Sequence, residues 1–414
     1  MKRIIFILTV AVLLSFNFLM AQGEASAIFL LIAPGSRAEA MGEAQVANSQ
    51  DAYSSYWNPA GMAFMPKSEI GLMHANWLKN LGIDDMYYDV VTGGVKTSMG
   101  TFGGHIIYLN LGEQQRTSPT GMDMGTFRSY LTATTLSYGT KLSKNSAIGI
   151  NTKVVYQKLT DKGTVQEEGT GSALHFAFDV GYQKRRIFSD RVDFGMALSN
   201  IGPKVTFIDE AQADPQPTNL KLGFNFNIVD QQFHKFSVVT DMNKMLVASH
   251  PSMDIDGDHY ISDSEEGYTD PLYKAIFTSW TDDWKYDGDI DYDGNGKIGG
   301  FTFNDISGTY EADTSAGSWG DFNERGKKEV GSKDDGSFQN EIDEMIFNVG
   351  MEYAYNNLFF LRAGFAYDKA GDIKTPTLGF GILYHNIGAD FGYTSAEEGH
   401  PLANTMRFSL RFMF

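Results

Sequence analysis

Two stretches in the second half of the chain carry acidic residues at alternate positions, a spacing that suits calcium. Calcium takes six to eight oxygen ligands, and alternating acidic residues on a tight loop bring their carboxylates to one point. The first stretch fits positions 1, 3, 5, 7 and 12 of an EF-hand-like loop with Asp254, Asp256, Asp258, Tyr260 through its backbone carbonyl, and Glu265. The second repeats the beginning of the pattern with Asp291, Asp293, Asn295 and, through its carbonyl, Lys297. We therefore expect calcium as a cofactor.

Each stretch departs from the full pattern at one position. His259 stands where the turn glycine belongs, and Thr302 stands where the bidentate acid belongs. The alternative interpretation is a solvated acidic loop whose spacing arises by chance. The surrounding charge favours calcium, because residues 247–344 contain 24 Asp and Glu against 7 Lys and Arg, a net charge of -17 out of -18 for the whole chain. Such a concentration of charge repels itself unless cations neutralise it.

The segment 247–344 is 98 residues long and shows little alternation of apolar and polar residues. It is too long for a plain loop in a compact fold, so it is either a functional subdomain or disordered. The rest of the chain does alternate, and the last ten residues show it best. There Met406, Phe408, Leu410, Phe412 and Phe414 share one face, and Arg407, Ser409 and Arg411 share the other. A strand of this kind fits the wall of a membrane barrel with a polar lumen, because lipid tolerates no open sheet edge.

Fourteen segments read as strands, and the lengths of their connections distinguish a membrane barrel from a soluble β-sandwich. Joins after even-numbered strands are short and most joins after odd-numbered strands are long, as in outer-membrane barrels with short periplasmic turns and long external loops. We predict an all-β, antiparallel outer-membrane barrel of about 14 strands with both termini on the periplasmic side. The predicted strands are 68–78, 86–97, 100–112, 127–142, 146–160, 171–185, 191–202, 219–229, 234–246, 345–356, 358–369, 375–386, 387–396 and 405–414.

The first 21 residues have the pattern of a secretory signal peptide. Lys2 and Arg3 precede an apolar run that ends before the small residue Ala21, which offers a cleavage point. A transmembrane anchor is the alternative, although this run is short for a span. The predicted organisation is a signal peptide (1–21), an N-terminal plug segment on the periplasmic side (22–67), strands one to nine (68–246), an acidic extracellular insertion with calcium-type loops (247–344) and strands ten to fourteen (345–414).

A block of motifs lies between the signal peptide and the first strand. It comprises Gly35-x-Arg37, Met41-Gly42-x-Ala44, Asp51 and Tyr56-Trp57-Asn58-Pro59-Ala60-Gly61, all within 27 residues. On these residues the chain resembles the PorV/PorQ family of Bacteroidetes-type outer-membrane proteins, a relative of the FadL fatty-acid transporters. The resemblance implies a fourteen-stranded barrel, and the strand count above agrees with it independently. It covers roughly residues 28–246 and 345–414, but not the acidic insertion.

The plug motif supplies candidate site residues, namely Arg37, Asp51, Tyr56, Trp57, Asn58 and Pro59. Small residues such as Ala38, Ala40 and Ala44 would let a short helix pack closely, and Asn58-Pro59 favours a turn. Arg37 and Asp51 have possible partners among the lumen charges Arg407, Arg411 and Glu352. The alternative is that these residues only seat the plug and bind no ligand.

Two functions follow from the resemblance. Similarity to PorV implies an accessory barrel of type IX secretion, which receives cargo by its C-terminal signal domain and passes it to the surface attachment machinery. Similarity to FadL implies a passive channel for hydrophobic compounds. A third possibility is a calcium-rigidified surface platform that uses the barrel as an anchor. The expected partners are outer-membrane lipids and secreted cargo or secretion-system components, and the Trp-Asn-Pro block is closer to the first function.

Enzymatic activity is not expected. The chain has no His-Glu-x-x-His, Gly-x-Ser-x-Gly or phosphate-loop motif. Lumen-facing residues such as His175, Asp179 and Asp193 fit a solvated wall better than a catalytic site. The alternative is a hydrolase with its nucleophile and base on neighbouring strands. The acidic insertion argues against a nucleic-acid partner, since nucleic acids bind positively charged surfaces.

Overall fold

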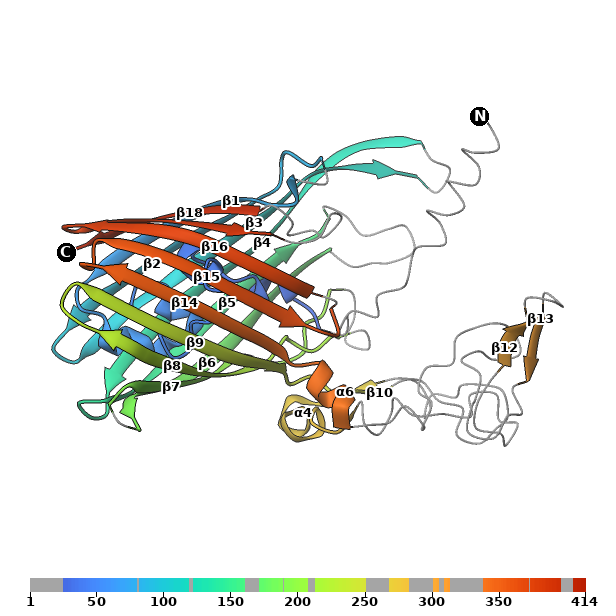
Figure 1. The fold of residues 1–414 in the computed structure, drawn as a ribbon. Helices are drawn as coiled ribbons and strands as arrows, with labels where there is room; N and C mark the ends of the chain where they lie inside the picture. The colour runs from blue at the N-terminus through green and yellow to red at the C-terminus, as the bar shows by residue number, and fades with distance from the viewer. Residues whose placement is uncertain are drawn as a thin grey trace, which may run out of the picture.

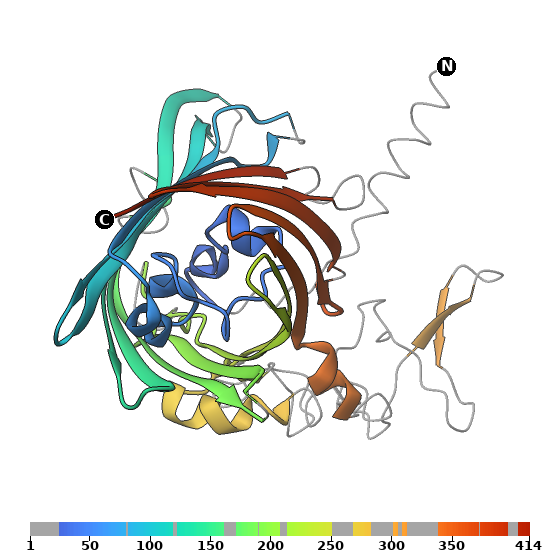
Figure 2. The same cartoon turned by 60° about the vertical axis from the view of Figure 1, so that its left-hand side comes forward.

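The computed structural model describes residues 25–414 apart from 80–81, 119–121, 161–170, 189, 208–212, 251–267, 283–300, 305–308, 313–337, 372 and 396–404. Within these residues, fourteen antiparallel strands close into a barrel (Figures 1 and 2). Strands β1 (Glu69–Asn76) and β18 (Thr405–Met413) pair with each other and complete the ring. The predicted fourteen-stranded barrel is therefore confirmed. The signal peptide and the predicted calcium ligands lie outside the described residues.

The other strands follow one another around the wall, and β9 pairs with β14 where the insertion leaves the barrel. They are β2 (Tyr87–Thr97), β3 (Gly100–Thr117), β4 (Asp123–Lys141), β5 (Ser146–Lys158), β6 (Ser172–Ile187), β7 (Val192–Ile201), β8 (Asn219–Asp230), β9 (His234–Met245), β14 (Ile346–Tyr355), β15 (Phe359–Asp368), β16 (Ile373–Tyr384) and β17 (Ile387–Thr394). The turns after β2, β4, β6, β8, β14 and β16 are short. We call the side of these turns, where the C-terminus also lies, the turn end, and the opposite side the loop end.

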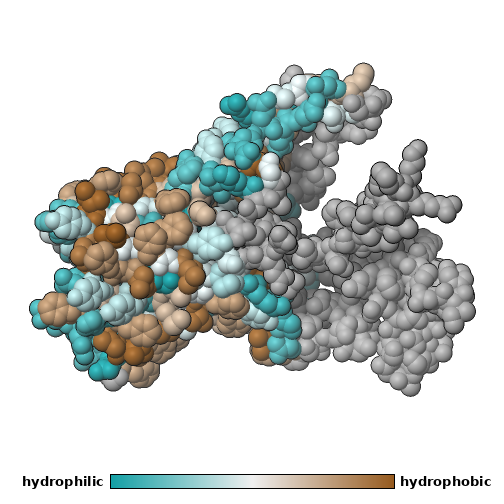
Figure 3. Space-filling view, turned by 45° about the horizontal axis from the view of Figure 1, so that its top comes forward, coloured by the Kyte–Doolittle hydropathy of each residue, from teal (hydrophilic) through white to brown (hydrophobic). Residues whose placement is uncertain are grey.

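The outer face of the wall is apolar. In β18 the side chains of Met406, Phe408, Leu410 and Phe412 are exposed, whereas Arg407 and Ser409 are buried against the interior. Figure 3 shows hydrophobic residues over much of the visible face of the wall. The alternation predicted for the last ten residues thus sorts lipid-facing from lumen-facing side chains.

The hairpin of β3 and β4 is longer than predicted. The expected connection was 113–126, but β3 runs to Thr117 and β4 begins at Asp123. A bulge between Asn110 and Glu113, with Gly112 at a φ of 75°, separates the wall from this extension. The extension is almost entirely polar, so it lacks the alternation that marks a strand against lipid, and a sequence pattern built on that alternation misses it.

Parts of the insertion form small elements at the loop end. Strands β10 (Ser249–His250) and β11 (Tyr268–Thr269) pair, as do β12 (Phe301–Asn304) and β13 (Thr309–Ala312), and helices α4 (Leu272–Thr278) and α6 (Phe338–Asp343) are described. Asp270 anchors α4 by accepting hydrogen bonds from Lys274 (2.6 Å) and Thr278 (2.7 Å). Burial alone would raise the pKa of Asp270, but these hydrogen bonds outweigh it and lower the pKa. None of the described helices is long and apolar enough to cross a bilayer.

Residues 25–65 lie inside the barrel, as the blue segment in Figure 2 shows. They form four short helices, η1 (Ile28–Leu31), α2 (Ser36–Glu39), α3 (Ser54–Trp57) and η2 (Pro59–Phe64). An apolar cluster joins η1, α2 and α3 to the inner face of β1–β5 and includes Phe29, Leu30, Trp57, Tyr88 and Ile107, while η2 packs separately against Ala147 of β5. We call residues 25–65 the plug.

Candidate functional site

The plug motif folds back on itself through its aromatic and amide side chains. Trp57 donates its indole N–H to the carbonyl of Pro34 (3.1 Å), and Tyr56 donates its hydroxyl to the carbonyl of Leu30 (3.1 Å). The two rings meet edge to face, with centroids 5.2 Å apart. The ammonium of Lys221, from β8, lies 5.0 Å from each of these rings. Both aromatics therefore act as packing residues that join the two halves of the plug and face the wall.

Asn58 and Pro59 start helix η2. The Asn58 side-chain oxygen accepts from the N–H of Ala60 (3.1 Å), which is an N-cap, and Pro59 occupies the first helical turn, where its missing N–H is not needed. The Asn58 amide nitrogen donates to the carbonyls of Val46 and Tyr182, at 3.0 Å each. Because Tyr182 belongs to β6, this one side chain caps a helix and ties the plug to the wall.

Arg37 and Asp51 belong to a closed ring of alternating charges. Arg37 makes a two-pronged contact to Glu352 on β14, with Nε–Oε2 at 3.0 Å and Nη2–Oε1 at 3.1 Å. The ring then continues through neighbouring side chains and returns to Arg37: Glu352 to Arg362 (2.7 Å), Arg362 to Asp390 (2.7 Å), Asp390 to Arg411 (3.0 Å), Arg411 to Asp51 (3.8 Å) and Asp51 to Arg37 (3.5 Å). Glu69 adds a weaker contact to Arg411 at 3.9 Å. Each buried charge thus faces opposite charges on both sides.

Arg407 has a different partner from those suggested by the sequence. It pairs with Glu39 at the end of α2, and its guanidinium also donates to the carbonyl of Ala33 (2.6 Å). Arg407 is 1% exposed, so an ion pair of this kind must be satisfied within the protein. The sequence suggests Arg407 as one of several possible lumen partners of the plug residues Arg37 and Asp51, because the alternation of its strand places it in the lumen. That alternation does not give its height along the barrel axis.

Glycines of the wall allow the plug backbone to come into direct contact with the strands. Gly139 on β4 faces Pro59, Gly149 on β5 faces Pro59 and Ala60, Gly195 on β7 faces Val46, and Gly364 on β15 faces Gly42. A Cβ atom at any of these positions would overlap backbone atoms of the plug. We call this set, which also includes Gly181, Gly350, Gly379 and Gly392, the glycine belt. Its members pair across the strands in several places, for example Gly139 with Gly149 and Gly149 with Gly181.

Wall side chains also satisfy the polar backbone of the plug. Asp241 accepts from the N–H groups of Gln45 (2.5 Å) and Val46 (2.8 Å), and Gln183 donates to the carbonyl of Ala47 (2.5 Å). Gly42, at a φ of 60°, donates to Thr377 (2.9 Å) and accepts from Asn348 (2.6 Å). These bonds replace water for irregular backbone that the barrel buries.

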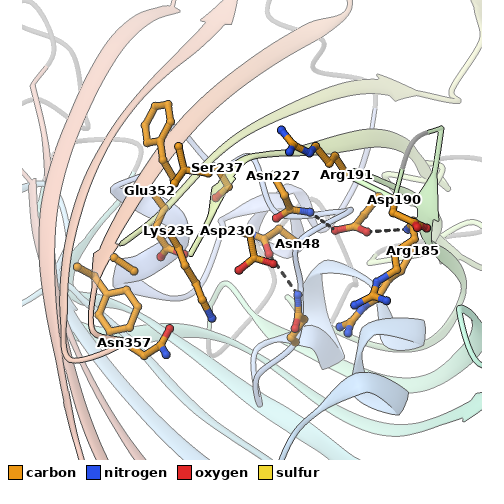
Figure 4. A pocket seen from close by; sticks show the side chains of 17 residues that line it. Asn48, Arg185, Asp190, Arg191, Asn227, Asp230, Lys235, Ser237, Glu352 and Asn357 are labelled. Carbon is orange, nitrogen blue, oxygen red and sulfur yellow. Dashed lines mark hydrogen bonds between the residues drawn. The ribbon is translucent and has the colours of Figure 1, made fainter. Parts of the chain in front are cut away.

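A polar cavity of about 570 Å³ opens at the turn end between the plug and strands β6–β9 and β14–β15 (Figure 4). Asn48 and Gln50 form its plug side. The wall side carries charged groups of both signs: Arg185, Arg186, Asp190, Arg191, Asp193, Asp230, Lys235 and Glu352. The wall residues come from strands that precede the insertion in the sequence and from strands that follow it, so the cavity depends on the pairing of β9 with β14.

Other lumen residues are more buried than the sequence suggested. His175, Asp179 and Asp193 were expected to be solvated, but each is buried, because the plug excludes water from the lumen. Asp179 pairs with Lys153 at 2.9 Å, and the Lys153 ammonium also donates to Asn200 at 2.7 Å.

The calcium prediction has no counterpart in the described part of the chain. All nine predicted metal ligands lie outside the described residues, and among those that the structure describes, no group of three His, Asp or Glu side chains could hold a metal ion. The sequence did not indicate Glu39, Glu69 and Asp241 as contacts between the plug and the wall, nor Arg362 and Asp390 as members of the charged ring on the wall. The parity of the strands could have placed the four wall residues in the lumen, but not their partners.

Comparisons with known proteins add the following. The family model described as type IX secretion system protein PorV matches residues 22–252, more than half of the chain. Similar solved structures include the Ralstonia pickettii toluene transporter TbuX, with 12% identity, a TM-score of 0.48 and coverage of 93% of this chain and 100% of that one. The P. putida toluene transporter TodX has 11% identity and a TM-score of 0.49, covering 92% and 99%. A Pseudomonas aeruginosa FadL homologue has 11% identity and a TM-score of 0.44, with coverage of 92% of this chain and 98% of that one. No curated protein matches the chain.

Proposed function

Because the chain belongs to the family of the type IX secretion system protein PorV, we propose that it is an accessory barrel that receives exported cargo and passes it on at the cell surface. The protein is a bacterial outer-membrane barrel, and its apolar outer wall contacts lipid. The short turns then face the periplasm and the long loops face the exterior. The finer part of the proposal is that cargo is handled on the outside of this barrel and does not cross its lumen.

The observation that carries this proposal is the anchoring of the plug around the whole circumference. It is held by Glu352 on β14, Ser409 on β18, His105 on β3, Gln183 on β6 and Asp241 on β9. A domain of 100 residues has a radius of gyration of about 13 Å. A folded cargo domain of that size could not pass through the lumen unless the entire plug left the barrel and these contacts broke. A shuttle that binds cargo at its loops or outer wall needs no such change.

Locking the plug to the wall tests this route. The Ser36 and Ser409 hydroxyl oxygens are 2.9 Å apart, and the chain contains no cysteine, so Ser36→Cys with Ser409→Cys offers a single engineered disulfide. We expect cells with the oxidised variant to secrete cargo normally. Each single substitution is the matched control. Secretion that stops on oxidation and returns on reduction would show that the plug must move, and would overturn the proposed route.

Deleting the protein tests the secretion role itself. We expect cargo to accumulate in the periplasm with its C-terminal signal domain uncleaved, while the uptake of hydrophobic compounds is unchanged. The runner-up function, a passive channel for hydrophobic compounds as in the FadL-like interpretation, predicts the reverse result. Normal secretion with reduced uptake would therefore favour the channel.

We further propose that the insertion binds calcium through Asp254, Asp256, Asp258 and Glu265, with a second loop around Asp291. The ligand spacing and the net charge of -17 over 247–344 support this proposal. Calcium should protect residues 254–305 from proteolysis, and a chelator should restore cleavage. Asp256→Ala with Asp293→Ala should remove the protection while the barrel keeps its heat-modifiable migration. Equal cleavage with calcium and with chelator would instead indicate a solvated acidic loop.

A further inference from the structure

Arg185 is a cation at the edge of the periplasmic cavity that forms no ion pair with a described carboxylate, although Asp193 attracts it electrostatically over a longer distance. Its guanidinium carbon lies 3.8 Å from the centroid of the Phe64 ring, so stacking on a plug residue holds it in place. Its Nε and Nη2 atoms are buried and have no hydrogen-bond partner among the described residues, and no described carboxylate forms an ion pair with it. A half-buried guanidinium with two buried nitrogen atoms that lack hydrogen bonds is costly for a fold to maintain unless a ligand uses it.

The backbone around Arg185 is shaped to place this side chain. The register between β6 and β7 shifts between Lys184 and Ile187, which marks a bulge, and Arg186 in the bulge has a φ of 57°. A left-handed conformation is uncommon for a residue other than glycine, and bulges often redirect side chains beside functional sites. Asn145, in the turn between β4 and β5, supports the bulge because its backbone carbonyl accepts from the Arg185 N–H at 2.7 Å.

The acidic groups nearest the centre of the cavity are already engaged. Glu352 is shared by Arg37 and Arg362, and Asp193 accepts from Asn225 (2.8 Å), Asn227 (3.2 Å) and the Arg186 N–H (3.0 Å). Figure 4 shows Arg185 and Arg191 on one side of the cavity and Lys235 on the other. The rim therefore offers several cations to an incoming anion, while Asp190 and Asp230 remain exposed at the edge.

We propose that this cavity binds a carboxylate carried by a flexible peptide segment that enters from the periplasm, with Arg185 as the principal contact. The volume of about 570 Å³ lies within the range of ligand pockets and exceeds what a small ion needs. A planar guanidinium suits both carboxylate and phosphate. The four acidic residues of the lining favour the singly charged carboxylate, because they repel a dianion more strongly. The site does not depend on the secretion role, because it requires only the barrel, its plug and its orientation.

Peptide binding to the full chain in a non-ionic detergent tests the site. The probes are a fluorescent Gly-Glu repeat peptide, the matching Gly-Gln peptide and inorganic phosphate as a competitor. The variants are Arg185→Gln and, as a matched control, Arg116→Gln. Arg116 is also stacked on a ring, 5.5 Å from the centroid of Phe127, but it lies in the loop-end hairpin. Loss of a charged hydrogen-bonding partner should weaken binding of the Glu peptide by roughly tenfold or more in Arg185→Gln alone.

The outcomes separate the possibilities. Wild-type affinity in Arg185→Gln, equal loss in Arg116→Gln, or equal binding of the Gln peptide would each overturn the site. Phosphate that binds where the Glu peptide does not would identify a free anion as the ligand and overturn the peptide assignment. If Arg185→Gln loses its heat-modifiable migration, Arg191→Gln with Lys235→Gln replaces it, since both residues are on the rim. That pair should weaken the Glu peptide several-fold, and unchanged binding would count against the proposal.

Discussion

The plug is held differently on its two sides. Towards β14–β18 and β1, charged side chains form the ring that contains Arg37, Glu352 and Arg411. Towards β4–β7, the plug side of each described contact is neutral and no described ion pair joins the plug to the wall: the plug backbone lies against the glycines of the belt, Asn58 bridges to Tyr182, and the ring of Phe64 receives the Arg185 guanidinium. Glycines also line the side of β14–β18 and β1, but charges of the plug and the wall alternate only on that side.

This difference indicates separate roles for the two sides. Long charged side chains can follow a small displacement of the plug, whereas backbone atoms that touch glycine cannot. The neutral side therefore sets how closely the plug approaches the wall, and the charged side sets its orientation. Buried ion networks of this type serve specificity in some proteins, although an apolar replacement can be equally stable.

Removing the central carboxylate of the charged side should have the largest effect. Glu352→Ala leaves Arg37 and Arg362 without their shared partner, and we expect a loss of about 3–5 kcal/mol in unfolding free energy. Urea unfolding in detergent, followed by intrinsic fluorescence, measures this loss. The control is Glu113→Ala, whose exposed pair with Arg128 (3.5 Å) should contribute less than about 1 kcal/mol. Similar losses in both variants would contradict the importance of the ring.

Adding one methyl group to the neutral side should come next. In Gly149→Ala the new Cβ would overlap the backbone of Pro59 and Ala60, and we expect a loss of roughly 1–3 kcal/mol together with easier proteolysis of the plug. Gly93→Ala is the matched control, because its Cβ would meet no atom closer than 3.4 Å. If the two alanine variants behave alike, close backbone approach does not determine the position of the plug.

Asn58→Ala examines the link between helix η2 and the wall. The substitution removes the capping hydrogen bond from the Ala60 N–H and both hydrogen bonds that the Asn58 amide donates. We therefore expect a loss of about 1–2 kcal/mol in unfolding free energy. Asn58→Asp separates the two contributions, since it retains the capping oxygen and loses the donor. Thermal unfolding should rank Asn58→Asp between the wild type and Asn58→Ala. A wild-type melting temperature in Asn58→Ala would argue that neither contribution matters.

Asp51→Asn should have the smallest effect and sharpens the description of the ring. Its charged contacts are long, 3.5 Å to Arg37 and 3.8 Å to Arg411, and asparagine can still accept from the Tyr53 N–H as Asp51 does at 3.0 Å. We expect a loss below about 1 kcal/mol in the urea experiment. A loss equal to that of Glu352→Ala would mean that the ring acts as a single cooperative unit.

The sequence by itself determined the barrel. Alternation with a period of two is local, since each strand must present apolar residues to lipid and polar residues to the lumen, and the even count followed from the lengths of the joins. The same local signal failed for the extension of β3 and β4, where Glu113, Gln114 and Gln115 are beyond the wall and need not alternate. The family block was also readable from the sequence, because it depends on specific residues at short spacing.

Only the tertiary structure decided which lumen residues meet the plug. Parity placed Arg407 and Arg411 on the inner face, but the height of each residue along the axis depends on the register of all fourteen strands. Glu39 therefore pairs with Arg407, and Asp51 with Arg411. The glycine belt has the same origin, because a glycine in a strand has no local meaning until a second backbone approaches it. The pairing of β9 with β14 and the curvature of the sheet bring residues from β6 and β14 to one cavity, and local patterns contain no information about that distance.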